Sequence, residues 1–141
     1  MSKTRQELME IIKHRHKNTV LEALGISVDA FDPEVVVSLV VDHRHLQHAG
    51  IVHGGIFVLL AESAASIAGA LLVDITKYNV FGMEINANHV RSVASGKISA
   101  QSRLIYQGRT TLVYGIESTN DKSELVSVSR CTLAVRKKNS R

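Results

Sequence analysis

The sequence predicts an α+β domain in which one long helix is inserted among about six mostly antiparallel strands. Two observations support this prediction. Residues 54–73 form the longest apolar run of the chain and are apolar nearly all round, as a buried helix would be. Shorter segments with the patterns of strands lie on both sides, two before this run and four after it. At 141 residues the chain is most simply one domain, residues 1–141, and is long enough to bury a core.

The part of the chain before the long helix is predicted to hold one short surface helix and two strands. Apolar side chains recur among charged ones over about residues 3–17, which indicates the short helix. Residues 25–42 are rich in valine and are interrupted at Asp32-Pro33, so they are predicted as two strands. A polar loop is expected over residues 43–52 and leads into the long helix.

Four strands are expected after the long helix. They occupy residues 81–92, 96–108, 109–120 and 124–137, and turns are expected at Ser95-Gly96, Gly108 and Asn120-Asp121. The second of these strands alternates, and the side chains expected together on one of its faces are Ile98, Ala100, Ser102, Leu104 and Tyr106. The basic residues at the end of the chain, about 137–141, are expected to form a solvated tail.

A glutamate, Glu62, stands in the middle of the long apolar run. The run is long enough to span a membrane, but a carboxylate at the centre of a bilayer costs about 2.5 kcal/mol or more. A helix wrapped by its own sheet is therefore the better interpretation. Small side chains would let a partner approach one face of this helix, and they are Ala61, Ala64, Ala65, Ala68, Gly69 and Ala70.

A buried carboxylate needs either a compensating partner or a chemical use. One interpretation of Glu62 is a structural carboxylate that is hydrogen-bonded to a serine or to the backbone. The other is a general base or nucleophile that has been removed from water. Ser66 follows Glu62 by four residues, so both lie on one helix face, where Ser66 could hold the carboxylate or a water.

The long helix opens with His53-Gly54-Gly55, which leaves backbone N–H groups uncovered at the positive end of the helix dipole. Such donors suit a developing oxyanion. His53 precedes Glu62 by nine residues, which places the two on opposite helix faces and about 13–14 Å apart along the axis. Two antiparallel copies of the helix would bring the Gly54 end of one near Glu62 of the other. We therefore expect a homodimer with sites at the interface.

The run QHAGIVHGGIFVLLAESAASIAGA, from Gln47 to Ala70, and the run GMEINANHVRS at residues 82–92 carry a family resemblance. They resemble the PaaI-like acyl-CoA thioesterases with the hotdog fold, in which a sheet wraps a long central helix. The most similar branch contains the dihydroxynaphthoyl-CoA and enterobactin-proofreading thioesterases. The resemblance covers about residues 20–136. It implies hydrolysis of an aromatic or medium-size acyl-CoA without a metal or redox cofactor, by homodimers that commonly pair into homotetramers.

The resemblance also implies roles for residues around the long helix. Glu62 matches the catalytic carboxylate, which acts as a nucleophile or as a base on water, and the Gly54 N–H matches the oxyanion donor. Gln47 matches a side chain that positions the substrate or the lytic water. His53 matches a histidine that flanks the thioester, and Ser66 matches the hydroxyl that orients the carboxylate or its water.

Substrate-binding residues are implied in the strands. His89 and Arg91 match the strand that lines the pantetheine or acyl channel. The turn Gly108-Arg109-Thr110 matches a region that meets the CoA phosphates, and Arg136 is expected to join it. Relatives in this branch often have proline and an aromatic residue after the glutamine, where this chain has His48-Ala49. This departure bears on the acyl preference and not on the reaction.

Two other function classes remain open at this stage. A hotdog hydratase or dehydratase also pairs a histidine with a helix carboxylate. A non-catalytic hotdog domain would bind acyl-CoA without turnover, but it would have no use for a buried base. The presence of Gln47, Glu62 and Ser66 together therefore favours hydrolysis.

Metal and nucleic-acid functions are not supported. The loop histidines match no standard zinc pattern and are expected to be solvated; they are His43, His45 and His48. The net charge of +4 admits anionic partners, but 4% aromatic residues and no tryptophan give little surface for stacking bases. A single cysteine, Cys131, and a polar start of the chain favour a cytoplasmic protein.

Overall fold

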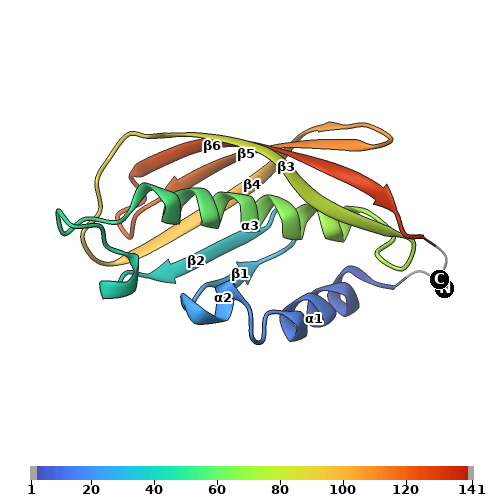
Figure 1. Ribbon diagram of the computed structural model, residues 1–141, viewed down its shortest axis with the longest axis horizontal. Helices are drawn as coiled ribbons and strands as arrows, with labels where there is room; N and C mark the ends of the chain where they lie inside the picture. The colour runs from blue at the N-terminus through green and yellow to red at the C-terminus, as the bar shows by residue number, and fades with distance from the viewer. Residues whose placement is uncertain (1–2, 140–141) are drawn as a thin grey trace.

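The computed structural model describes residues 3–139 and shows one long helix, α3, held against a curved six-stranded sheet (Figure 1). All neighbouring strands are antiparallel, in the order β1-β2-β4-β5-β6-β3. The helices are α1 (Arg5–Arg15), α2 (Val20–Ala23) and α3 (Gly54–Leu72), with a 3₁₀ turn at His43–His45. The strands are β1 (Ser27–Ala30), β2 (Val36–Val40), β3 (Tyr78–His89), β4 (Lys97–Gln107), β5 (Thr111–Thr119) and β6 (Leu125–Lys137). The predicted α+β class and the six strands are confirmed.

The N-terminal helix α1 lies beside the C-terminal half of α3 (Figure 1). Its start is fixed by a capping box, in which Thr4 accepts from the Glu7 backbone N–H and donates its own N–H to the Glu7 carboxylate. The predicted surface helix is therefore present, two residues shorter at each end than predicted. It is not only a surface element, because Met9 is fully buried and belongs to the core.

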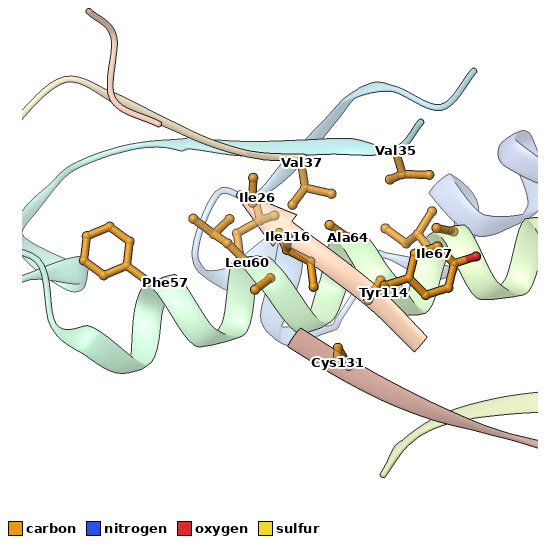
Figure 2. Packing of buried hydrophobic residues seen from close by; sticks show 14 of the residues in the cluster. Ile26, Val35, Val37, Phe57, Leu60, Ala64, Ile67, Tyr114, Ile116 and Cys131 are labelled. Atoms are coloured by element: carbon orange, nitrogen blue, oxygen red, sulfur yellow. The ribbon is translucent and has the colours of Figure 1, made fainter. Parts of the chain in front are cut away.

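The helix α3 is the core helix of the domain. It is long and apolar enough to cross a membrane, with a mean hydropathy of 1.9, but here it is packed inside the sheet. Figure 2 shows Phe57, Leu60, Ala64 and Ile67 of α3 among the apolar side chains of the sheet. The burial of these side chains holds the helix against the sheet. The stabilisation grows with the apolar area removed from water, and each turn of the helix adds to that area.

The small face of α3 packs against the sheet of the same chain. Ala61, Ala64 and Ala65 are fully buried there. A Cβ built on Gly69 would lie 2.6 Å from Cδ1 of Leu133 on β6, so the absence of a side chain allows this close approach. The sequence predicted a partner for this face, and within residues 3–139 most of it is already covered by the chain's own strands.

The strand β4 departs from the predicted alternation in its second half. Ile98, Ala100 and Ser102 are buried, as expected for one face. The register with β5 shifts between Leu104 and Tyr106, and these two side chains are 40% and 57% exposed. Leu104 precedes the shift and keeps the expected face. The prediction that Tyr106 shares this face is wrong, because one extra residue in a strand moves later side chains to the other face.

The loop between β2 and α3 is organised around His45, which is buried at 1% exposure. Its Nδ1 accepts from the Asp42 backbone N–H at 2.9 Å, and its Nε2 donates to the Leu24 carbonyl at 2.8 Å. The His45 carbonyl in turn accepts from the His53 N–H at 2.9 Å, at the start of α3. The expectation of a solvated loop histidine is wrong for His45, whereas His43 and His48 are exposed.

Replacing His45 by alanine is expected to lower the free energy of unfolding by about 2–3 kcal/mol, because it leaves a cavity and removes the partner of two partly buried backbone groups. Urea unfolding monitored by circular dichroism measures this loss. The matched control is His43→Ala, an exposed histidine of the same turn, for which we expect a change below about 0.5 kcal/mol. Equal stability of the two variants would contradict the structural role of His45.

The predicted basic tail begins later than expected. β6 continues to Lys137, where it still pairs with Tyr78 of β3, and Lys138 donates its backbone N–H to the Lys77 carbonyl. The tail prediction for residues 140–141 lies outside the described residues.

Candidate active site

The N-terminus of α3 is capped by a histidine. His53 has an extended backbone, with φ −62° and ψ 134°, and its Nδ1 accepts from the Gly55 N–H at 2.9 Å. This cap satisfies one of the N–H groups that every helix leaves free at its start. The Gly54 N–H has no hydrogen-bond partner between residues 3 and 139. It is therefore a free donor at the positive end of the helix.

A cavity of about 360 Å³ opens beside this free donor. The residues that line it are Gln47, Ile51, Val52, Gly54, Phe57, His89, Val90, Arg91 and Ser92. Four of the predicted site residues thus meet in one place, although they come from the loop before α3, from α3 itself, from β3 and from the segment after β3. Polar groups that converge in a small apolar cavity are typical of a ligand site.

Gln47 is held within its own loop. Its side-chain Oε1 accepts from the Ala49 N–H at 2.7 Å, and its backbone N–H donates to the Ile51 carbonyl at 2.8 Å. These bonds leave the side-chain NH₂ group of Gln47 available in the cavity. Arg91 is exposed at the other side, where its guanidinium lies 3.7 Å from the Glu124 carboxylate.

His89 is fixed on three sides. Its Nδ1 lies 2.9 Å from the hydroxyl oxygen of Ser127 on β6, and its ring centroid lies 5.2 Å from that of Phe57. Its Nε2 rests against the first residue of α3, since a Cβ built on Gly54 would lie 2.9 Å from it. His89 is therefore bonded to a neighbouring strand and also lines the cavity.

Glu62 lies outside this cavity. It follows Gly54 by eight residues, which is about 12 Å along the helix axis. Its carboxylate rests on Gly82 of β3, where any Cβ would overlap Oε1 of Glu62. The β3 register shifts immediately after Gly82, so the strand bends at the point where it receives the carboxylate.

The carboxylate of Glu62 has no hydrogen-bond partner within the described part of the chain, and no hydrogen bond joins it to Ser66. The neighbouring Ser63 donates to the Leu59 carbonyl at 2.6 Å instead. The structural interpretation, in which a serine or the backbone satisfies Glu62, thus finds no support between residues 3 and 139. A partly buried carboxylate without a protein partner remains available to a ligand or a water.

The buried cysteine near Glu62 is not a nucleophile. Burial raises the pKa of the Cys131 thiol to about 11, and the carboxylates of Glu62 and Glu84 add to the effect. The thiol therefore stays protonated at neutral pH, and the protonated form is unreactive.

The predicted phosphate-binding residues lie at the opposite end of the sheet from the cavity (Figure 1). Gly108, Arg109 and Thr110 form the turn between β4 and β5. The Thr110 carbonyl accepts from Val135 on β6 at 2.9 Å, which places Arg136 next to this turn. One chain thus keeps the cavity, Glu62 and the basic turn apart.

Two residues of this region were missed by sequence reasoning, Gly82 and Ser127. A glycine inside a predicted strand indicates a bulge or a close approach, so Gly82 carried a usable signal. The sequence signal for Ser127 was weaker, because it consisted only of a polar residue within a strand that also holds apolar residues. No group of three or more metal-ligating side chains occurs in residues 3–139.

Comparisons with known proteins agree with this fold. The family model described as the thioesterase superfamily matches residues 49–127. The chain is 46% identical to ComA2 of Bacillus subtilis over 123 residues, which cover 86% of this chain and 98% of that protein. It is 41% identical over 118 residues to a 1,4-dihydroxy-2-naphthoyl-CoA hydrolase of Listeria monocytogenes, covering 83% of this chain and 95% of that one.

A solved structure agrees over nearly the whole chain. The crystal structure of a mutant thioesterase PA1618 from Pseudomonas aeruginosa superposes with a TM-score of 0.88 at 37% identity. The match covers 98% of this chain and 97% of that one. The chain therefore belongs to the thioesterase superfamily, has the hotdog fold of its PaaI-like members, and is a thioester hydrolase.

Proposed function

We propose that this hydrolase cleaves acyl-CoA thioesters to a free acid and CoA, with Glu62 as base or nucleophile and the Gly54 N–H as oxyanion donor. The observation that carries the proposal is the unpaired Gly54 N–H in a cavity with Gln47 and His89. A backbone donor of this kind stabilises the negative charge that develops on the thioester oxygen. The acyl group we propose is aromatic or of medium size, in line with the named activity of the Listeria relative.

The reaction uses only groups of the chain and water. The thioester oxygen accepts from Gly54 while either the Glu62 carboxylate or a water activated by it attacks the carbonyl carbon. The C–S bond breaks and the sulfur leaves as CoA thiolate. His53 uses Nδ1 as the helix cap, so its Nε2 carries the ring proton and can donate to that thiolate. In the nucleophilic route, water then hydrolyses the mixed anhydride and restores Glu62.

The separation of Gly54 and Glu62 along α3 supports a site that is shared by two copies of the chain. β3 is the last strand of the sheet, pairing only with β6 in the described residues. Its outer edge is long and carries exposed Phe81 and Met83, at 55% and 58% exposure. Such an edge readily pairs with another strand. We propose that β3 pairs with β3 of the partner subunit across a two-fold axis.

The register of this pairing follows from the two half-sites. If the two-fold axis passes beside Ile85, near the middle of β3, Gly82 lies next to His89 of the partner subunit. Glu62 rests on Gly82, and His89 rests on Gly54, so this register brings Glu62 to the cavity of the partner subunit. Arg136 pairs with Asn79, which the same arrangement places near Arg91 of the partner subunit, so the basic turn approaches that cavity as a site for CoA phosphates. Pairing of two such dimers would give the tetramer.

Complementation tests the shared site. We expect that inactive Glu62→Gln subunits, mixed and refolded with inactive Gly54→Pro subunits, recover about a quarter of wild-type activity, because half the dimers are mixed and hold one intact site. A thiol-trapping reagent measures the CoA released. The control mixes Glu62→Gln with the double variant Glu62→Gln/Gly54→Pro, in which no site has its glutamate. If neither mixture recovers activity, both groups act within one subunit.

The acyl-CoA hydrolase itself is tested with a panel of aromatic and straight-chain acyl-CoA thioesters. CoA release from at least one member supports the proposal, and the best member defines the acyl class. Hydration of an enoyl-CoA without CoA release would instead identify a hydratase. Saturable binding without either reaction would identify a binding domain.

A further inference from the structure

The hydroxyl of Ser127 is buried behind the cavity and faces His89. Ser127 has no exposed surface and stands opposite His89 in the pairing of β3 with β6. Its oxygen lies 2.9 Å from Nδ1 of His89. Phe57 and Gly54 also lie against this ring, although His89 as a whole is exposed.

The direction of this hydrogen bond follows from the surroundings of the hydroxyl. Ser127 Oγ has no second hydrogen-bond partner within residues 3–139. If the hydroxyl accepted from an Nδ1–H, its own proton would be buried without an acceptor, and unpaired buried donors are rarer than unpaired acceptors. The hydroxyl therefore donates to Nδ1. The ring proton of His89 must then reside on Nε2.

Nε2 of His89 lies at the start of α3, beside the cavity. Nε2 has no hydrogen-bond partner in the described part of the chain and lies against Gly54, whose N–H is also unpaired. Two free donors, one from the backbone and one from a side chain, therefore border the same cavity. A pair of fixed donors is the usual construction of an oxyanion hole.

We propose that Ser127 is a positioning residue that holds His89 as the Nε2–H tautomer, so that His89 is a second donor to the thioester oxygen beside Gly54. This inference rests on the proposed acyl-CoA hydrolysis. It gives His89 a defined role in the reaction and gives a function to a buried serine that touches no substrate.

Two measurements test the proposal. Nitrogen-15 NMR of histidine-labelled protein is expected to show His89 as the Nε2–H tautomer in the wild type and as a mixture in Ser127→Ala. In kinetics, Ser127→Ala is expected to lower kcat about 10-fold with KM changed less than about 3-fold, since the donor acts mainly on charge that develops in the transition state. Ser127→Thr, which keeps the hydroxyl, should restore most of kcat.

A double-mutant cycle and a matched control complete the test. In a His89→Ala background, Ser127→Ala should have no further effect, because its only route of action has been removed. The control is Ser129→Ala, which removes a buried β6 hydroxyl that finds no hydrogen-bond partner among residues 3–139, and should leave kcat unchanged.

Three outcomes would overturn the inference. They are an Nδ1–H tautomer in the wild type, wild-type kcat in Ser127→Ala, and the same loss with or without His89. A protein that hydrolyses no acyl-CoA would overturn the proposed function instead, and the tautomer measurement would still decide whether Ser127 orients the ring.

Discussion

Replacing Glu62 by glutamine is expected to lower kcat for acyl-CoA hydrolysis by at least about 100-fold, which corresponds to nearly 3 kcal/mol of activation free energy. The amide has almost the size of the carboxylate and still fits against Gly82, but it can neither attack the thioester nor take a proton from water. No hydrogen bond to the described residues is lost, so we expect the melting temperature to stay within a few degrees. The loss should therefore fall on kcat and not on folding.

Glu84 provides the matched control for this prediction. It lies on β3 close to Gly82 and is exposed. Its Oε1 accepts a hydrogen bond from the Asn86 side-chain Nδ2 at 3.0 Å. Glu84→Gln removes the same charge from the same strand and should keep kcat within about 2-fold, because it leaves both Glu62 and the backbone hydrogen bonds of β3 intact. If Glu62→Gln hydrolysed the best substrate as fast as Glu84→Gln does, Glu62 would be a structural carboxylate and the binding-domain interpretation would gain support.

The sequence was informative about the elements because their patterns are local. A mostly apolar run predicted α3 with an error of one residue at its end, since a long apolar segment bounded by polar residues defines both ends of a core helix. The alternating segments gave all four strands after it. Local patterns do not report where a strand takes an extra residue, so the shift after Leu104 was not predictable from β4 alone.

The candidate site could be predicted only in part, because it depends on contacts between distant segments. Gln47, Gly54 and His89 were each expected to be functional, and the fold brings them to one cavity. The bond from His89 to Ser127 joins positions 38 residues apart, which is set by the register of β3 on β6. His45 shows the same limit, since its partner carbonyl lies 21 residues earlier in the chain.

Helix periodicity also predicted that His53 and Glu62 of one chain lie apart. The spacing of His53 and Glu62 implied that they belong to different places on α3, and the structure separates Glu62 from the cavity. The proposed contact between subunits is different from the one first expected. Most of the small face of α3 is buried by the chain's own sheet, and the contact that we propose instead uses β3, the longer of the two edge strands.

Replacing Gly54 by proline is expected to lower kcat about 100-fold below the value for Gly54→Ala, because proline removes the N–H that we propose as the oxyanion donor. Gly54 is the first residue of α3, the position where proline is best tolerated in a helix. The extended backbone of His53, at φ −62° and ψ 134°, is the conformation that a residue before proline requires. The helix start should therefore survive the substitution.

The alanine variant separates the N–H from the added side chain. Alanine and proline both place a Cβ near Nε2 of His89, at 2.9 Å if nothing moved, so both displace that ring to a similar extent. Only proline also removes the backbone donor. A large difference in kcat between the two variants, at similar melting temperatures, would assign the oxyanion contact to the Gly54 N–H. Equal kcat values would move that contact to another donor of the cavity, and His89 would be the first to examine, because its Nε2 borders the same space.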